Sequence, residues 1–476
     1  MGTPARHADG AFVNTLRREE FYARLPIPLQ NAACTMEGWR VRRNRYGGGF
    51  PSILREAEER LRWPHERLLA FRDDRLRRLL RHCAGSVPYY RRLFRSIGFD
   101  PAAVRSLADL AGLPVLDKTT VQDNIAELQS TEVPAGKRVD VKTSGTTGAG
   151  LHFTTTREAL HEQWAVWWRC WRRRGITQSV RCGYFGGRTI VPLGQRDAPY
   201  WRVNRAGRQI LFSAYHLSPH TLPDYVRALR EHRPPWLHGY PSVLALLSHL
   251  MVEQRLSLPY VPSWITTGAE NLLPHQSAVI ETALGARPVQ HYGMAEAVAN
   301  FSQCQRGRLH VDEDFAAVEF LPRSDGTGYR VVGTNLSNAS TPLVRYDAGD
   351  MVASVEERCE CGLSGRAVVA VDGRQEDYVV LRNGARLGRM DHIFKDMTAV
   401  RQAQIVQDRP GTIVTRIVRS PTYGPADEAG LREAFFHRLG DEAEVRFEYV
   451  DDLPRTAGGK LRFVVSSLRE GRLQSD

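Results

Sequence analysis

Several features that would place this chain in a familiar structural class are missing from its sequence. The seven cysteines are odd in number and scattered, which excludes the paired framework of a small disulfide-rich secreted protein. No apolar run approaches the roughly 18 residues of a membrane-spanning helix. Residues 1–14 carry charge without the apolar stretch of a secretory signal, and repeats and low-complexity segments are also missing. We therefore expect a soluble cytoplasmic protein.

Acidic residues are also scarce relative to basic ones. The chain has 53 aspartates and glutamates against 65 lysines and arginines, a formal net charge of +12. This balance favours anionic ligands such as nucleotides and coenzyme A, and it is compatible with nucleic acid or an acidic membrane surface. With 42% hydrophobic residues, the 476-residue chain has the composition of a globular protein of about two to four domains or subdomains.

The spacing of apolar residues predicts an α/β protein. Residues 1–50 have no regular pattern, whereas 51–99 show helical spacing interrupted at Pro88, which predicts two or three amphipathic helices. Short apolar segments then alternate with helical ones, as in a layered α/β domain. The predicted strands are 181–185, 236–239, 264–267 and 289–291, and the predicted helices are 157–174, 241–253 and 274–284.

Beyond Gly373 the pattern becomes that of a small α+β module. Strands are predicted at 402–407, 412–419 and 444–450, with a helix at 426–439. About 100 residues is an ordinary domain size. We therefore predict three parts, which are an N-terminal helical part of a large domain at 1–115, its ligand-binding core at 116–373 and a small C-terminal domain at 374–476.

The predicted helix at 157–174 combines four tryptophans with four arginines, namely Trp164, Trp167, Trp168, Trp171, Arg169, Arg172, Arg173 and Arg174. Interleaved aromatic and basic residues are typical of single-strand nucleic-acid binding, which would be sensitive to salt. The alternative is a core-facing aromatic stripe with a solvated basic end. The tryptophans share one helical face, which favours the alternative. We therefore expect no nucleic-acid partner and no membrane partner.

A segment rich in glycine and hydroxyl groups follows Lys142. Successive backbone N–H groups in such a turn can form an anion-binding concavity, and hydroxyls add donors for phosphate oxygens. The segment is not a Walker A loop, because it lacks the Gly-Lys pair of that motif. A phosphate site of another kind and an ordinary surface turn are the two interpretations. The residues concerned are Ser144, Gly145, Thr146, Thr147 and Gly148.

Five further segments matter because of their order along the chain, although each alone is a weak signal. They are Thr266–Glu270, His291–Glu296, Val344–Asp350, Asp372–Asp377 and Pro454–Lys460. Together with the glycine-rich turn they resemble the signature motifs of the adenylate-forming (acyl-CoA synthetase) superfamily. The phrases Val87–Arg91, Pro199–Asn204 and His238–Ser242 resemble its phenylacetate–CoA ligase-like, capsular-polysaccharide-associated branch. The resemblance extends from about Trp39 to Ser467.

This resemblance implies a fold and a reaction. The fold would be a large domain of layered sheets and helices with a small mobile C-terminal lid. A carboxylic acid and MgATP would form an acyl-adenylate and pyrophosphate, and the acyl group would then pass to coenzyme A. Transfer to an amine or hydroxyl, in a polysaccharide or natural-product pathway, is the alternative. The identity of the acid and the oligomeric state, a homodimer being one option, are not implied.

The resemblance also implies roles for individual residues. The Ser144–Gly148 turn would hold the ATP phosphates, although Ala149 stands where the wider family commonly has lysine. Lys460 would stabilise the negative charge that develops when the carboxylate attacks the α-phosphate. Glu296 would help to bind Mg²⁺. The remaining ligand-binding candidates are Gly268, Ala269, Glu270, Tyr292, Gly293 and Met294 for adenine, Asp350 and Arg374 for ribose, and His238 and Tyr240 for the acid.

Three cysteines and a histidine suggest a metal site. Cys304, His310, Cys359 and Cys361 would make a tetrahedral Cys₃His zinc site of the structural kind. The single residue between the last two cysteines is a tighter spacing than usual, which favours four ordinary reduced residues instead. The resemblance supports zinc, because some members of the branch place a structural zinc at matching positions. Both interpretations stay open.

Overall fold

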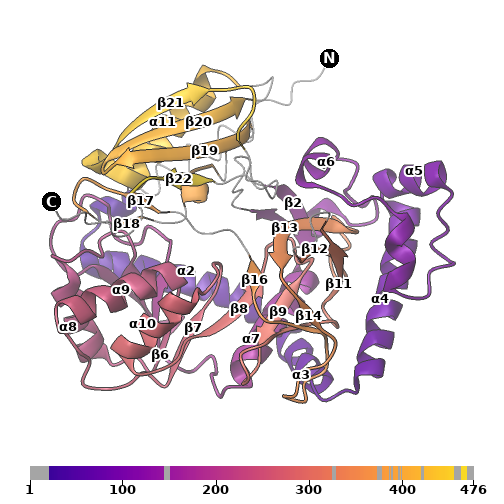
Figure 1. Ribbon diagram of the computed structural model, residues 1–476, viewed down its shortest axis with the longest axis horizontal. Coiled ribbons are helices and arrows are strands. Elements are labelled where there is room, and N and C mark those ends of the chain that lie inside the picture. Colours follow the sequence, from indigo (N-terminus) through magenta and orange to yellow (C-terminus); the bar gives the residue numbers. More distant parts are fainter. Residues whose placement is uncertain are drawn as a thin grey trace.

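The computed structural model describes residues 21–143, 151–323, 328–372, 378–384, 386–387, 390–394, 397, 399–419, 423–454 and 463–468. Within these residues the chain forms a large part around a ten-stranded sheet and a smaller C-terminal part around a four-stranded sheet. Figure 1 shows the C-terminal part, in yellow, lying across the large part. The predicted α/β class is confirmed.

The central sheet combines parallel and antiparallel strands. Its parallel strands are β5 (Gln209–Ser213), β3 (Cys182–Gly186), β6 (Trp236–Gly239), β7 (Trp264–Thr267) and β8 (Val289–Gly293). Antiparallel strands extend both edges, namely β4 (Trp201–Asn204), β9 (Asn300–Gln303), β10 (Leu309–Val311), β15 (Ala367–Val368) and β14 (Val355–Glu356). The four strands predicted between residues 181 and 291 are β3, β6, β7 and β8.

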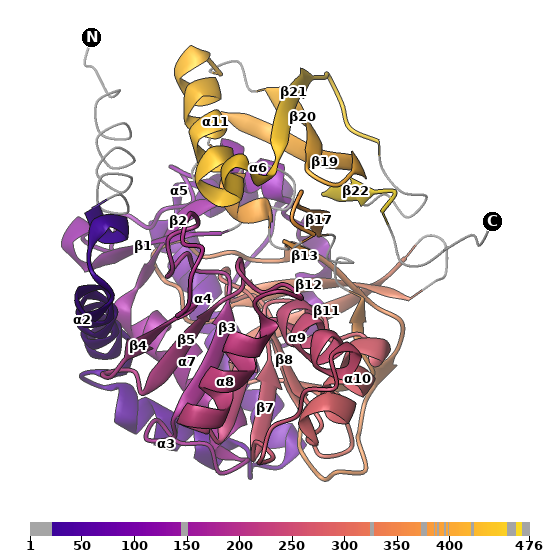
Figure 2. The ribbon, with the colours of Figure 1, turned by 90° about the vertical axis from the view of Figure 1, so that its left-hand side faces the viewer.

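Helices cover both faces of the parallel strands. On one face lie α8 (Leu222–His232), α9 (Pro241–Glu253) and α10 (Pro274–Leu284), which share a hydrophobic core with β3, β5, β6 and β7. Figure 2 shows α8 and α10 in front of the sheet. On the other face, α7 (Arg157–Arg172) packs with α3 (Phe50–Arg60). The predicted helices at 241–253 and 274–284 are confirmed, and proline occupies the first turn of both.

A second sheet and several short elements complete the large part. The sheet has the order β11 (Ala316–Pro322), β12 (Tyr329–Asn335), β13 (Tyr346–Val352) and β16 (Val371–Asp372). A two-stranded ribbon joins β1 (Arg138–Lys142) to β2 (His152–Thr156). The short helical elements are α6 (Lys118–Asp123), η1 (Leu107–Gly112) and η2 (Ala135–Lys137).

The N-terminal region contains one helix more than the sequence pattern predicts. The segment from 51 to 99 forms α3, α4 (His65–Ser86) and α5 (Pro88–Ile97), with Pro88 starting the last of them. Residues 1–50 show no regular apolar pattern, yet they contain the helix α2 (Ile27–Tyr46). This helix has no apolar periodicity because polar contacts attach it to β4. Asn31 Oδ1 accepts the Val203 N–H at 2.8 Å, and Gln30 Oε1 accepts from Arg202 Nε at 2.5 Å.

The C-terminal part is the predicted α+β module. Its sheet has the order β21 (Glu444–Tyr449), β20 (Thr412–Arg419), β19 (Val400–Arg409) and β22 (Val464–Ser466), covered by α11 (Pro425–Leu439). The short elements β17 (Val379–Val380), β18 (Arg386–Leu387), η3 (Met390–Phe394) and η4 (Gly440–Glu442) lie around it. Tyr215 of the large part belongs to the same hydrophobic cluster, with the Arg438 guanidinium 4.9 Å from its ring centre. The two parts therefore pack against each other.

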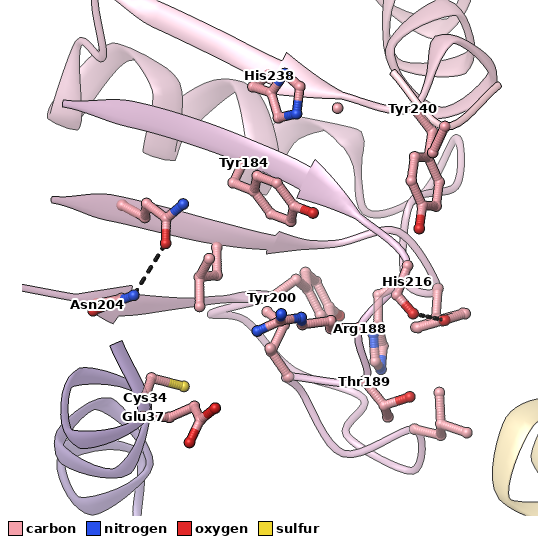
Figure 3. Close-up of a pocket in the computed structure, with 18 of the residues that line it drawn as sticks. Cys34, Glu37, Tyr184, Arg188, Thr189, Tyr200, Asn204, His216, His238 and Tyr240 are labelled. Carbon is pink, nitrogen blue, oxygen red and sulfur yellow. Dashed lines mark hydrogen bonds between the residues drawn. The ribbon is translucent and has the colours of Figure 1, made fainter. Parts of the chain in front are cut away.

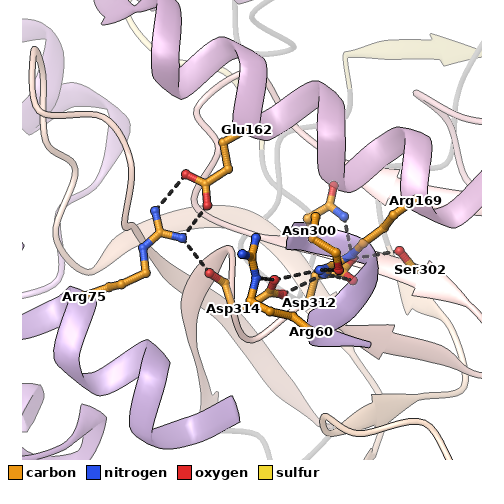
Figure 4. Close-up of polar contacts among 9 residues, drawn as sticks. Arg60, Arg75, Glu162, Arg169, Asn300, Ser302, Asp312 and Asp314 are labelled. Atoms are coloured by element: carbon orange, nitrogen blue, oxygen red, sulfur yellow. Dashed lines mark hydrogen bonds and ion pairs between the residues drawn. The ribbon is translucent and has the colours of Figure 1, made fainter. Parts of the chain in front are cut away.

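The tryptophans of α7 lie between the core and the cavity, and one arginine of its basic end, Arg169, is not solvated as expected. Trp168 and Trp171 are buried against Trp236, with ring centres 6.2 and 5.6 Å apart. Arg169 is only 2% exposed. Its guanidinium donates to Asp314 at 2.6 Å and to Asp312 at 2.7 Å (Figure 4). A carboxylate partner is what makes a buried arginine tolerable, and a partner distant in sequence gives no local signal.

This ion pair is part of a larger arrangement that we call the buried network, formed by Arg60, Arg75, Glu162, Arg169, Asp312 and Asp314 (Figure 4). Arg60 Nε donates to Asp314 Oδ2 at 2.6 Å, and Arg75 pairs with Glu162. Burial raises the pKa of the Asp314 carboxyl, but the charges of Arg169 and Arg60 outweigh burial and hold it far below its ordinary value. The network thus joins α3, α4 and α7 to the segment before β11.

None of the helices in the described ranges combines the length and the apolar composition that a membrane-spanning segment requires.

Candidate nucleotide and acid site

A cavity of about 2120 Å³ lies between the carboxyl ends of the parallel strands and the C-terminal part. Residues directly after β3, β6 and β7 line it, namely Gly187, Tyr240 and Gly268, as does Gly293 at the end of β8. Leu387 and Phe436 line it from the C-terminal part. Ligands of open α/β sheets bind at this edge. The volume exceeds the roughly 300–1,000 Å³ of a single small-molecule pocket, so it accommodates a nucleotide and a second ligand.

The turn after β7 is held by the N-terminus of a neighbouring helix. Ala269 adopts a left-handed backbone conformation with φ of 67°. The next residue, Glu270, accepts the backbone N–H of Ser242 at 3.0 Å through Oε2, and Ser242 lies in the first turn of α9. A carboxylate at a helix N-terminus is stabilised by unpaired N–H groups and by the helix dipole. Glu270 therefore fixes the conformation in which Gly268 and Ala269 line the cavity.

Tyr292 and Asp350 meet although they come from different sheets. The Tyr292 hydroxyl at the end of β8 donates to Asp350 Oδ2 of β13 at 2.7 Å. One face of the Tyr292 ring packs on Phe301, with ring centres 4.7 Å apart. The structure thus brings together the residue expected to stack on adenine and the residue expected to bind ribose.

The segment after Tyr292 is fixed through its backbone. A side chain at Gly293 would approach Asn300 Oδ1 to 2.7 Å and Trp167 Nε1 to 3.1 Å, so this position requires glycine. The carbonyl of Met294 accepts from Gln163 Nε2 at 2.9 Å, and the carbonyl of Glu296 accepts from Asn335 Nδ2 at 3.2 Å. These contacts define the position from which the Glu296 side chain extends.

His238 is a neutral member of the cavity wall. Its Nδ1 lies 2.8 Å from Thr266 Oγ1, and its ring lies 5.5 Å from that of Trp171 and 5.6 Å from that of Tyr184. Burial lowers the pKa of His238 to about 4. An imidazole with this pKa is uncharged at neutral pH, which suits contact with a substrate better than proton transfer. Tyr240 lies on the same wall (Figure 3).

Three groups of predicted residues lie outside the described residues. These are the Ser144–Gly148 turn, Arg374 and Lys460. The ribbon of β1 and β2 leads into and out of the first, with Lys142 paired to His152. Arg374 follows the strand pair β13–β16, in which Met351, the residue after Asp350, pairs with Asp372.

The four metal-ligand candidates come together near the opposite end of β9. The nearest donor atoms of Cys304, His310, Cys359 and Cys361 all lie within 4.8 Å of one another. His310 Nε2 is 3.2 Å from Cys361 Sγ. Burial raises the pKa of the Cys304 thiol, but hydrogen bonds from the backbone of Arg306 and Arg308 outweigh burial and lower it overall. A low thiol pKa favours the thiolate, which is the form that binds metal.

Sequence reasoning missed the part of the cavity wall that α2 and the loop after β3 form. Tyr22, Cys34, Glu37, Arg45 and Arg188 line it. In Figure 3, Arg188 extends from its loop toward α2, where Cys34 and Glu37 face the cavity. No local signal marks these residues, because α2 lacks apolar periodicity and its contacts with the loop span more than 140 positions.

Comparisons with known proteins identify relatives of this chain. A family model described as the CapK C-terminal domain matches residues 381–467. Protein CapK from Staphylococcus aureus is 23% identical over 463 residues, covering 94% of this chain and 99% of that protein. Phenylacetate-coenzyme A ligase from Thermus thermophilus is 25% identical over 444 residues, covering 84% of this chain and 97% of that protein.

Solved structures show the same fold. The structure of 2-hydroxyisobutyryl-CoA ligase with 2-HIB-AMP and CoA, in the thioesterification state, aligns with a TM-score of 0.53 and 20% identity. The alignment covers 86% of this chain and 91% of that chain. The same ligase in the postadenylation state aligns with a TM-score of 0.51 and 19% identity, covering 85% and 90%. The chain therefore has the fold of this acyl-CoA ligase, which is the fold that the sequence resemblance implied.

Proposed function

Because the chain is homologous to CapK and to phenylacetate–coenzyme A ligases, and has the fold of an adenylate-forming acyl-CoA ligase, we propose that it activates a carboxylic acid with MgATP and transfers the acyl group to coenzyme A. One observation carries the proposal. Segments from separate parts of the sequence meet beside the cavity: Gly293 lines it, and the hydroxyl of the preceding residue, Tyr292, lies 2.7 Å from Asp350.

The nucleotide would lie at the carboxyl ends of β7 and β8. Gly268, Ala269, Gly293 and Met294 would border the adenine, and the Tyr292 ring would stack on it. The Tyr292 hydroxyl already orients the Asp350 carboxylate through the 2.7 Å hydrogen bond. A carboxylate held in this way can accept hydrogen bonds from both ribose hydroxyls, and Arg374 would add a donor.

The first half-reaction joins two anions. A carboxylate oxygen attacks the α-phosphorus, and pyrophosphate leaves from it. The Lys460 ammonium group would lie beside the developing oxyanion and stabilise its negative charge. The Ser144–Gly148 turn would hold the leaving phosphates. A carboxylate such as Glu296 is the hard oxygen donor that Mg²⁺ takes together with nucleotide phosphates, and the ion would neutralise phosphate charge.

In the second half-reaction the thiol sulfur attacks the acyl carbon. The carbon–oxygen bond to AMP breaks, and the thiol proton leaves with AMP or solvent. The C-terminal lid, 374–476, borders the cavity and would rotate near Arg374 to exchange Lys460 for the thiol, while 1–115 and 116–373 form the large domain. Relatives named coenzyme A ligases support coenzyme A over an amine or hydroxyl.

The Cys₃His group fits zinc. Four donors within 4.8 Å of one another, three of them thiols, match a closed structural site. We propose that Cys304, His310, Cys359 and Cys361 would hold Zn²⁺ and tie the β9–β10 turn to the segment after β14. Its chemistry would be structural, and no reaction step depends on it.

Pyrophosphate exchange into ATP tests the first half-reaction. A panel of carboxylic acids should include one that supports exchange, and Lys460→Ala should slow it by about 10²–10³-fold, because a preorganised charge acts on the transition state. Exchange at the wild-type rate in Lys460→Ala would refute the assigned role. Mass spectrometry of products formed with coenzyme A and with small amines identifies the acceptor.

A further inference from the structure

Several arginines line the cavity, among them Arg45 and Arg188, which form no ion pair within the described part of the chain. Arg45 of α2 and Arg188 of the loop after β3 both line the cavity. The carboxylate beside them, Glu37, is already bound by Arg40 through two hydrogen bonds of 2.7 Å. The other lining carboxylates, Asp441 and Glu442, belong to the C-terminal part. Glu37 is thus shared among Arg40, Arg45 and Arg188, and the wall presents more positive than negative charge to the cavity.

Arg45 and Arg188 line the same cavity, and their charges influence each other. Burial lowers the pKa of Arg45, and the charge of Arg188 lowers it further. Arg188 also contributes to lowering the pKa of Glu37, after the dominant hydrogen bond from Arg40. Arg45 is partly desolvated whereas Arg188 is exposed, and two like charges in one wall repel each other. An anion between them would relieve both the desolvation and the repulsion.

An aromatic path leads from the nucleotide turn to these arginines. A side chain at Gly293 would lie 3.1 Å from Trp167 Nε1, so the Trp167 ring borders that turn. The Trp167 and Trp164 ring centres are 4.8 Å apart, and the Arg45 guanidinium lies 4.1 Å from the Trp164 ring centre. Two adjoining indole rings thus connect the turn at Gly293 to the Arg45 guanidinium within one cavity, which Arg188 also lines.

We propose that the acid substrate carries a second anionic group, which Arg45 and Arg188 bind at the far end of the tryptophan path. This inference rests on the proposed function, because it concerns the acid used at the same site. Planar guanidinium forks match carboxylate and phosphate oxygens, and indole rings suit an apolar body between the two charged ends. A carboxylate, a phosphonate and a phosphate share the required chemistry.

Matched acids test the proposal. Pyrophosphate exchange is measured with α,ω-dicarboxylic acids of five to ten carbons and with 1,4-phenylenediacetate, each against its monomethyl ester. A phosphonate analogue of phenylenediacetate separates carboxylate from phosphate-type recognition. At least one dianion should exceed its ester in kcat/KM by about tenfold or more, as expected for hydrogen bonds to charged groups. Esters that equal or exceed every dianion would overturn the inference and leave the proposed function standing.

Variants locate the effect. Arg188→Gln is expected to lower kcat/KM for the dianion by about tenfold more than kcat/KM for its ester, because Arg188 is exposed and forms no ion pair within the described residues. Arg45→Gln should act in the same direction. Arg43→Gln is the control, since Arg43 lies on α2 but does not line the cavity. Equal losses for dianion and ester in Arg188→Gln would contradict the assignment.

Binding without turnover separates this inference from the proposed reaction. The preferred dianion should raise the Tm of the wild type and of Arg43→Gln, but not that of Arg188→Gln. If this shift occurs and no acid supports exchange, the anion site stands and the proposed ligase reaction fails. If no dianion either shifts the Tm or is preferred in exchange, the anion site is refuted.

Discussion

Two arginine-rich regions of this molecule use the same side chain in opposite ways. In the buried network, every guanidinium meets a carboxylate, as Arg169 does with Asp312 and Asp314 (Figure 4). In the cavity wall, Arg45 and Arg188 form no such ion pair among the described residues, and Figure 3 shows Arg188 there. The net charge of +12 does not distinguish the two. The comparison teaches that an arginine paired with a carboxylate of the same chain stabilises the fold. An arginine without such a partner is available to bind an anionic ligand.

The largest expected effect comes from breaking the network. Arg169→Met should lower the free energy of unfolding by about 3–5 kcal/mol, because it leaves buried carboxylates uncompensated. Urea denaturation measures the change. Arg172→Met is the matched control on the same helix, since Arg172 pairs with Glu58 near the surface and its loss should cost less than about 1 kcal/mol.

If Arg169→Met does not fold, a milder variant gives the answer. Ser302→Ala removes only the 2.8 Å hydrogen bond to Asp312 and should cost about 1 kcal/mol. Equal free energies of unfolding for Arg169→Met and Arg172→Met would contradict the claim that Arg169 compensates the buried charges of Asp312 and Asp314.

The two regions should also lose stability in different pH windows. The pKa of His238 in the cavity wall is about 4 and that of His291 about 3, both lowered by burial. Below about pH 6.5 the unfolded histidines bind protons that the folded ones do not, so stability falls from there toward pH 4. The pKa of Asp314 is depressed by Arg169, so the contribution of the network is complete above about pH 4 and is lost only below it.

Urea denaturation between pH 7.5 and pH 3 measures both windows. His238→Phe should reduce the loss between pH 6.5 and pH 4 by an amount on the order of 1–3 kcal/mol. Arg172→Met should leave both windows unchanged. A wild-type stability that stays constant down to pH 4 would contradict the assignment of neutral buried histidines.

A smaller effect is expected from introducing a carboxylate into the cavity wall as a partner for Arg188. Cys34 faces Arg188 in the wall (Figure 3), so Cys34→Asp places a carboxylate where the proposed ligand anion would lie. Exchange with the preferred dianion should fall about tenfold, and exchange with its ester should change little, since one charge-assisted contact is replaced. Cys34→Asn is the isosteric control. Equal behaviour of the two variants would show that charge compensation does not matter in this wall.

The parts of the fold that the sequence predicts are those with local signals. The helix at 241–253 starts at a proline and ends as expected, and the strand at 236–239 has the predicted bounds, because period and turn chemistry act within each segment. Tyr292 and Asp350 could be chosen from motif order, and the structure shows that they touch. The ligand roles of the motif residues stay predictions.

What the sequence does not predict depends on partners far along the chain. Hydrogen bonds of Gln30 and Asn31 attach the helix α2 to β4, and no apolar stripe does so. The sequence of α2 therefore lacks the helical spacing of apolar residues. Arg169 looks like a surface residue until Asp312 and Asp314 are placed beside it. The wall of Arg45 and Arg188 is likewise a meeting of segments about 140 positions apart. Such features follow from tertiary packing, which no window of the sequence contains.

The Tyr215 ring has a consequence for how the lid would respond to substrate. It is embedded in the hydrophobic cluster of the C-terminal part, and its hydroxyl donates to the carbonyl of Gly187, the residue before Arg188. Rotation of the lid would have to withdraw this ring, and an anion on Arg188 would act on the same short loop. The acid would then bind with different affinities to the two lid positions, and by linkage its arrival would shift the balance between them. The change from the first half-reaction to the second would thereby depend on the substrate's second anionic group, which lies away from the atoms that react.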